Sequence, residues 1–281
     1  MKYDKRRKYY LILDCETATL PFSKEFNCSK DIALQKPLIY DIGWQVVDKK
    51  GKVYKKVSYI VSETFFNLNV FETAYYNEKR PIYFNEIQNE NIVVSSWQQI
   101  TKELVFDLEN CESCGAYNSY FDFKKAIPFT ERYIKALYGN NEQEFFEKQR
   151  YACECIENRV KSNYKGNYDN EHFIFRDKKY KIFDIWYMAC KNLINCAEYK
   201  KFCYDNEYYN KYFSTSAEVV YRYFNSNDFV EQHRALQDVE IETEIFAKSV
   251  AKTKIIEQGI VSFPFRTLGT IKQYEKELSV T

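Results

Sequence analysis

The sequence predicts a mixed α/β fold in which one sheet carries helices on both faces. A short apolar run at Tyr9–Leu13 is typical of a strand buried on both sides in the middle of a sheet. Two segments alternate between apolar and polar residues around short turns, and this pattern predicts antiparallel hairpins. Stretches with helical spacing separate and follow them, which favours helices packed against a sheet.

The first half of the chain predicts a hairpin, an irregular segment and a helix. Residues 38–48 and 52–62 form the hairpin around the turn DKKG. Residues 63–95 are aromatic and irregular, so we interpret them as an insertion of short helices or loops. Helical spacing then runs from Ser96 to Leu108.

The second half begins with a short strand, CGAYNS at residues 114–119, that leads into a helix. A polar insertion at about 138–180 precedes and partly overlaps a second hairpin at residues 172–184. Several helices follow, up to a tail at about 253–281. Since no repeat or Gly/Ser linker interrupts this order, one domain spanning residues 1–281 is expected.

Composition narrows the classes of function. The chain has 281 residues, 45% apolar and 29% charged, and a net charge of only +1. A surface that wraps a nucleic acid duplex normally needs a strong basic excess, so that class is disfavoured. Nine cysteines, an odd number without a signal segment, indicate reduced thiols and a cytoplasmic location. No apolar run approaches the length of a membrane span.

Two carboxylates follow the first predicted strand in LDCET. Asp14 and Glu16 are two residues apart, so both point to the same face, roughly 6–7 Å from each other. Paired carboxylates repel unless a divalent cation such as Mg²⁺ neutralises them. A solvated strand end is the alternative. The same Asp-x-Glu spacing recurs at Asp107, Asp169, Asp205 and Asp238.

The stretch AYNSYFD places Asn118, Phe121 and Asp122 where a short strand turns into a helix. An aspartate at this position could instead be a helix cap.

The two histidines of the chain both satisfy His-x₄-Asp. His172 and Asp177 lie in the second hairpin, where neighbouring side chains point to opposite faces. His233 directly precedes an amphipathic helix that carries Asp238 in its first turns, so these two side chains can converge. A capping or packing histidine is the alternative.

The order of these three motifs is the decisive feature. Through LILDCETATL, YDIGWQVVDKKGKV, AYNSYFDFKKA and HRALQDVEIE, from residue 9 to about 252, the chain resembles the DnaQ-like DEDDh 3′→5′ exonucleases. KPLIYDIGW is similar to members from bacteriophages and prophages. The resemblance implies the ribonuclease H-like fold, a mixed five-stranded sheet flanked by helices.

The resemblance also implies a catalytic set. Asp14, Glu16, Asp122 and Asp238 would hold two Mg²⁺ or Mn²⁺ ions, and His233 would be the general base. The expected reaction removes 5′-nucleoside monophosphates from a single strand, with DNA preferred over RNA. Two alternatives remain: an exoribonuclease of the RNase T or oligoribonuclease kind, and a catalytically silent binding module.

For the substrate, the resemblance implies contacts from Thr17, Leu20, Asn118 and Phe121 to the terminal nucleotides. Any of the last three could instead be a core or turn residue. The expected partner is the 3′ end of single-stranded DNA or RNA, with replication proteins as further candidates. A phage-encoded protein would work in the host cytoplasm.

Two features are open to competing interpretations. Cys111 with Cys114, and Cys153 with Cys155, have spacings that a zinc site could use. Small thiols that pack in the core are the favoured interpretation. The aromatic insertion 63–95 could line a groove for a nucleic acid strand or form a structural cover over the sheet.

Overall fold

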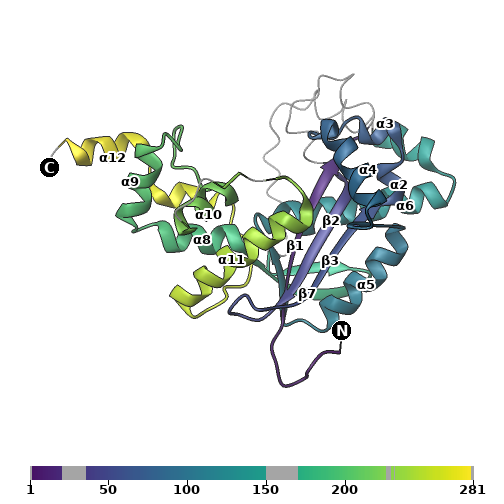
Figure 1. Ribbon diagram of the computed structural model, residues 1–281, viewed down its shortest axis with the longest axis horizontal. Coiled ribbons are helices and arrows are strands. Elements are labelled where there is room, and N and C mark those ends of the chain that lie inside the picture. Colours follow the sequence, from purple (N-terminus) through teal and green to yellow (C-terminus); the bar gives the residue numbers. More distant parts are fainter. Residues whose placement is uncertain (1, 21–35, 150–169, 226–228, 231, 280–281) are drawn as a thin grey trace.

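The computed structural model describes residues 2–20, 36–149, 170–225, 229–230 and 232–279 (Figure 1). Their strands form one sheet in the order β4-β3-β2-β1-β5-β7-β6. The strands are β1 (Tyr10–Ala18), β2 (Leu38–Val47), β3 (Val53–Val61), β4 (Val93–Ser95), β5 (Ser113–Ala116), β6 (His172–Phe175) and β7 (Lys178–Asp184). β2 runs antiparallel to both of its neighbours, whereas β1, β5 and β7 are parallel.

The expected mixed sheet flanked by helices is confirmed. Five strands, β3-β2-β1-β5-β7, form its centre, and the short strands β4 and β6 extend it at the two edges beyond the five that were expected. Both predicted hairpins are present, as β2–β3 and β6–β7.

β1 is the central strand that the apolar run predicted, but it is longer than expected. It continues to Ala18, so Asp14 and Glu16 lie within the strand and not at its end. The reason is pairing: β2 is long enough to bond the whole of β1, with a register shift between Glu16 and Thr17. β1 pairs with β5 only from Tyr10 to Ile12, so at Asp14 and Glu16 its pairing partner is β2 alone.

Each face of the sheet has its own hydrophobic core. Leu11 and Leu13 of β1 belong to one core, and Tyr10 and Ile12 belong to the other. The first core is completed by helices α5 (Trp97–Glu109) and α6 (Ile127–Tyr138), and the second by α8 (Ile185–Leu193), α9 (Ala197–Asp205), α10 (Ala217–Asn225) and α11 (Ala235–Thr253). Because side chains alternate along a strand, Asp14 and Glu16 share the α11 face with Tyr10 and Ile12.

Helix α11 packs very closely on β2. A methyl group at Gly43 would lie 2.5 Å from the backbone nitrogen of Leu236, at the start of α11. Gly43 is also the residue of β2 that pairs with Asp14. This glycine therefore allows the first turn of α11 to approach the carboxylates of β1.

The aromatic insertion folds into short elements, as predicted. They are α2 (Ser62–Phe65), α3 (Leu68–Phe71), η2 (Asn77–Lys79), α4 (Arg80–Gln88) and then β4. Figure 1 shows α2, α3 and α4 gathered with α6 on the side of the sheet away from α8–α10. Of the second insertion, residues 142–149 are helical and 150–169 lie outside the described residues.

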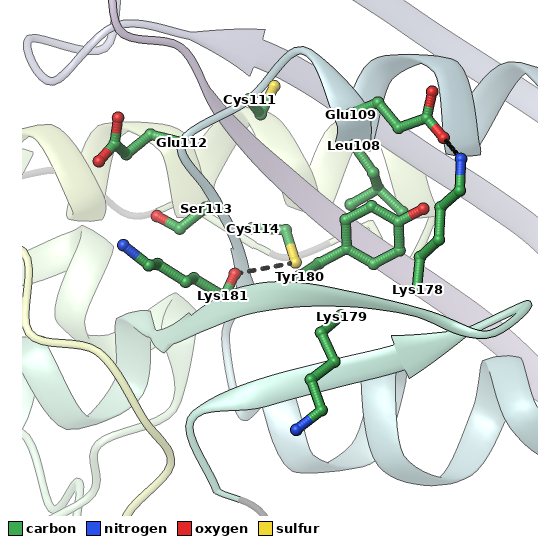
Figure 2. A pocket seen from close by; sticks show the side chains of 10 residues that line it. All are labelled: Leu108, Glu109, Cys111, Glu112, Ser113, Cys114, Lys178, Lys179, Tyr180 and Lys181. Carbon is green, nitrogen blue, oxygen red and sulfur yellow. Dashed lines mark hydrogen bonds and ion pairs between the residues drawn. The ribbon is translucent and has the colours of Figure 1, made fainter.

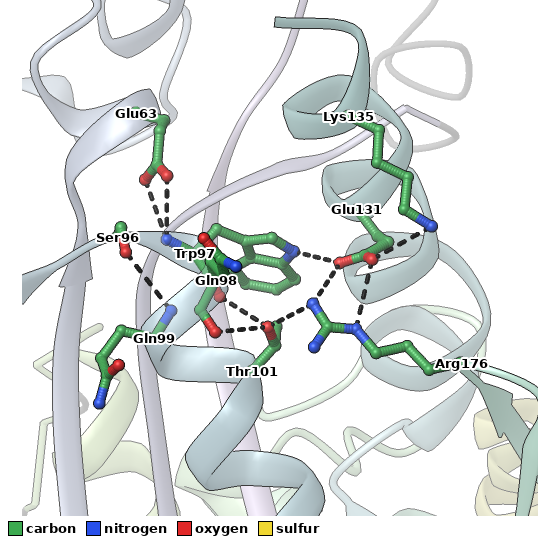
Figure 3. Close-up of polar contacts among 9 residues, drawn as sticks. All are labelled: Glu63, Ser96, Trp97, Gln98, Gln99, Thr101, Glu131, Lys135 and Arg176. Atoms are coloured by element: carbon green, nitrogen blue, oxygen red, sulfur yellow. Dashed lines mark hydrogen bonds and ion pairs between the residues drawn. The ribbon is translucent and has the colours of Figure 1, made fainter. Parts of the chain in front are cut away.

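A partly buried polar network joins the insertion to the body of the fold (Figure 3). The carboxylate of Glu63 accepts hydrogen bonds from the backbone nitrogen of Trp97 at 3.0 and 3.1 Å. The indole of Trp97 donates to Glu131 of α6 at 2.6 Å, and Arg176 pairs with the same carboxylate at 3.4 Å. The start of the insertion, α5, α6 and the β6–β7 turn are thus fixed to one another.

The C-terminal segment contains η4 (Pro264–Leu268) and α12 (Ile271–Leu278) and packs on the second core through Leu268 and Ile271. The backbone nitrogen of Gly259 donates to the carbonyl of Ile182 in β7 at 2.7 Å. Among the described residues, no helix combines the length and apolar character needed to cross a membrane.

Candidate active site

Asp14 and Glu16 are half-buried on the α11 face of β1. Asp14 pairs across the ladder with Gly43, and Glu16 pairs with Asp41. The register shift directly after Glu16 bends the strand, as bulges near functional sites often do.

Asp122 reaches the site from the far end of β5. The turn after β5 includes Asn118 with a φ of 68°, and the hydroxyl of Ser119 donates to the carbonyl of Phe183 at 2.6 Å. Asp122 then lies in η3 (Tyr120–Ala126), a π-helical turn of the kind frequently found at functional sites. Burial, followed by the charge of Asp14, raises the pKa of Asp122 well above its usual range.

His233 and Asp238 come from the junction that opens α11. His233 has a φ of 53°, and the backbone nitrogen of Ala235 donates to the carboxylate of Asp41 at 3.3 Å. A ligand atom of each of Glu16, His233 and Asp238 lies within 4.8 Å of the others. The structure therefore places Glu16 beside both His233 and Asp238.

Glu242 is a fifth carboxylate at this site that the sequence did not single out. It lies one helical turn after Asp238, is 4% exposed, and accepts a hydrogen bond from the backbone nitrogen of Tyr117 at 3.1 Å. Burial raises its pKa, and the charges of Asp14 and Asp122 raise it further. The i, i+4 spacing from Asp238 was the signal that could have found it.

The cluster fits a divalent cation. Asp14, Glu16, Asp122, Asp238 and Glu242 bring negative charge together in a mostly buried place, and ionised carboxylates there are unfavourable without a counter-charge. One buried carboxylate oxygen of Asp122 has no hydrogen-bond partner among the described residues. Hard oxygen ligands of this kind suit Mg²⁺ or Mn²⁺.

The imidazole of His233 lies at the edge of this cluster, half-buried. Burial lowers its pKa, and the positive charge of Lys79 lowers it further, whereas Glu218 opposes this shift. A histidine with a lowered pKa stays neutral down to a lower pH, and only the neutral imidazole can accept a proton.

No protein-family model matches the chain, and no curated protein matches it either. A structure described as the crystal structure of a full-length 3′-exonuclease is 10% identical, with a TM-score of 0.48, and the alignment covers 93% of this chain and 67% of that chain.

A second solved structure is described as 3′-end specific recognition of a histone mRNA stem-loop by a 3′-exonuclease. It is 11% identical with a TM-score of 0.49, over 93% of this chain and 71% of that chain. At this sequence identity and TM-score, neither structure assigns an activity to this chain.

The four residues expected to contact substrate lie in different environments. Thr17 directly follows the register shift of β1 and is half-buried. Asn118 is exposed and Phe121 is half-buried at the turn before Asp122, where the carbonyl of Asn118 accepts from the backbone nitrogen of Phe121 at 2.8 Å. Leu20 is only 2% exposed and belongs to the first core, so the structure favours a core residue over a base contact there.

A pocket of about 500 Å³ lies at the opposite end of β5 from this site (Figure 2). Its wall includes Cys111 and Cys114, and the thiol of Cys114 donates to the carbonyl of Lys181 at 3.5 Å. In the described part of the chain neither cysteine joins a group of potential metal ligands, so packing thiols are favoured over zinc. Cys153 and Cys155 lie outside the described residues.

Asp184 supports the site from β7. Its carboxylate caps α8 by accepting from the backbone nitrogen of Trp186 at 3.0 Å, and it also accepts from the backbone nitrogen of Asn118 at 3.3 Å. Burial raises its pKa from 3.8 to about 7, although the backbone donors oppose this shift.

Asp184→Asn is expected to change how the stability of the protein depends on pH. Because the folded-state pKa lies above the ordinary value, the native state binds this proton more tightly, and wild-type stability falls as pH rises between the two values. Asparagine keeps an acceptor oxygen but carries no charge. We therefore expect the stability of the variant relative to wild type to increase from pH 5 to pH 8 in denaturant unfolding. Parallel pH profiles for the two proteins would contradict this.

Proposed function

We propose that this protein is a metal-dependent 3′→5′ exonuclease that hydrolyses single-stranded nucleic acid. The observation that carries the proposal is the convergence of Asp14, Glu16, Asp122, Asp238 and His233 from three separate stretches of the chain. A binding module has no physical need to collect buried carboxylates at such a cost. A site for phosphodiester cleavage does, because the reaction places negative charge on the phosphate and the leaving oxygen.

In this proposal the four carboxylates Asp14, Glu16, Asp122 and Asp238 hold two divalent cations. When bound, the cations would stabilise the negative charge that develops on the attacking and leaving oxygens. Glu242, which is buried beside them and bonded to the backbone at Tyr117, positions α11 against the turn that carries Asp122.

His233 accepts a proton from the attacking water at its imidazole nitrogen. The oxygen of that water bonds to phosphorus, and the bond from phosphorus to the 3′ oxygen of the preceding nucleotide breaks. The released 3′ oxygen takes a proton, and the product is a 5′-nucleoside monophosphate. The neutral imidazole that this step requires agrees with the lowered pKa of His233.

For the substrate, we propose that Thr17, Asn118 and Phe121 contact the terminal nucleotides, since Thr17 directly follows Glu16, the other two closely precede Asp122, and none of the three is fully buried. The net charge of +1 fits a grip on a few nucleotides of one strand. DNA is the proposed preference over RNA. We also propose that residues 1–281 act as one domain, because both cores share a single sheet.

The test is digestion of single-stranded DNA and RNA labelled at either end, with Mg²⁺ or Mn²⁺, by wild type and Asp14→Ala. Stepwise shortening from the 3′ end that disappears in the variant and in chelator is expected, and the faster polymer identifies the preferred sugar. If folded wild type with metal cuts neither polymer, the nuclease proposal fails and a silent binding module becomes the better account.

A further inference from the structure

The aromatic insertion reaches the catalytic histidine directly. The ring of Tyr76 is stacked on the imidazole of His233, with 4.2 Å between ring centroids and 16° between ring planes. Tyr76 immediately precedes η2 in the insertion 63–95. Segments far apart in the sequence therefore meet at the residue proposed to move the proton.

Lys79 makes a second contact from the same segment. Its ammonium lies 4.3 Å from the centroid of Tyr76 and donates to the carbonyl of Gln232, the residue before His233, at 2.5 Å. The side chain of His233 and the backbone beside it are thus both contacted by one short piece of the insertion.

The insertion is itself fixed to the sheet on both sides of Tyr76. The hydroxyl of Thr73 accepts from the backbone nitrogen of Thr19 at 2.7 Å and donates to the carbonyl of the same residue at 3.0 Å. The hydroxyl of Tyr83 donates to Asp41 at 2.9 Å, and the same carboxylate oxygen accepts from the backbone nitrogen of Ala235. The segment that carries Tyr76 is therefore bonded to Thr19 just after β1 and to Asp41 of β2, which in turn bonds the first residue of α11.

His233 itself lies outside the helix that follows it. It lies before α11, with a left-handed φ of 53° that is uncommon for a histidine. Arg234 after it is tied to the insertion as well, through an ion pair with Glu86 at 3.5 Å. Without a contact on its face, the imidazole ring could rotate away from Glu16 and Asp238, and small misplacements of a catalytic group are costly.

We propose that Tyr76 is a positioning residue that orients the imidazole of His233, with Lys79 securing the adjacent backbone. This makes the short segment Tyr76–Lys79 of the insertion a part of the active site, and the rest of the insertion its support. The inference rests on the proposed function, in which His233 is the general base. Tyr76 has no assigned contact with substrate and acts through the ring that it stacks on.

Kinetics of Tyr76→Ala, Tyr76→Phe and Phe66→Ala on a labelled oligonucleotide provide the first test. Tyr76→Ala is expected to lower kcat by about 10- to 100-fold with little change in KM. Tyr76→Phe should restore most of the rate, because phenylalanine keeps the stacked ring. Phe66 is a half-exposed aromatic of the same insertion, and Phe66→Ala should behave like wild type. A loss confined to KM would overturn the inference and make Tyr76 a substrate-binding residue.

NMR of the imidazole protons provides a test that does not depend on activity. The chain has only two histidines, so the signals of His233 and His172 can be told apart by substitution. Tyr76→Ala should shift only the His233 signals downfield, because the ring current of the stacked tyrosine is lost, and His172 serves as the internal control. Unchanged His233 signals would overturn the inference. If wild type cuts no nucleic acid although the signals shift, the proposed function fails, and with it the catalytic role of Tyr76, but not the contact.

Discussion

Asp122→Asn is expected to abolish nuclease activity and at the same time to stabilise the metal-free protein. Asp122 is 1% exposed, and burial together with the charge of Asp14 disfavours its ionised form. Asparagine has nearly the same shape without the charge, so the substitution removes the free-energy cost of burying an ionised carboxylate. The rate of cleavage should fall by roughly 10³-fold or more, because stabilisation by a bound cation is worth several kcal/mol.

The two effects are measured separately. Single-turnover cleavage gives the loss of rate, and thermal unfolding in chelator at pH 8 gives the stability. Adding Mg²⁺ or Mn²⁺ should raise the melting temperature of wild type more than that of the variant. Asp205→Asn, at an exposed position in α9, is the control and should change neither quantity appreciably. A variant less stable than wild type in chelator would contradict the prediction.

Gly43→Ala is expected to reduce stability and activity together. The added methyl group would lie 2.5 Å from the nitrogen and 2.7 Å from the Cα of Leu236, and backbone atoms inside a packed helix–sheet contact cannot move aside freely. Overpacking of this kind typically costs about 1–3 kcal/mol. Moving the first turn of α11 away from β2 also carries His233 and Asp238 away from Glu16.

Denaturant unfolding and cleavage of a labelled strand measure these two losses. Gly139→Ala is the matched control. Gly139 follows α6 at the surface, and a methyl group there would meet its nearest backbone oxygen at 3.2 Å, so a much smaller effect is expected. Wild-type stability and activity in Gly43→Ala would show that α11 does not need this close approach.

The sequence predicted those parts of the fold that depend on local patterns. Alternation predicted both hairpins, and helical spacing predicted α5. The extension of β1 to Ala18 could not be predicted in this way, because it results from pairing with β2 and not from the apolar character of the strand itself. Strand ends set by a partner carry no signal in the strand's own residues.

The candidate site, too, could be predicted only where a local motif marks its residues. Each of the five residues predicted to be catalytic occupies a recognisable motif, and the structure places three of them, Glu16, His233 and Asp238, close together. Glu242 was missed, although i, i+4 spacing placed it beside Asp238. An apolar leucine suits either a contact with a nucleotide base or a place in the core. The burial of Leu20, which the sequence does not reveal, favours the core. The stack of Tyr76 on His233 joins segments that no local pattern connects.

The arrangement of the site along the chain has a consequence for synthesis. Asp14 lies on β1, whereas Asp238 and Glu242 lie on α11 and His233 directly before it, later in the chain. Ribosomes add about 5–20 residues per second, so the site stays incomplete for roughly 10–40 seconds after Asp14 has been added. If the protein is a nuclease, its activity begins only when α11 has left the ribosome and docked on the sheet.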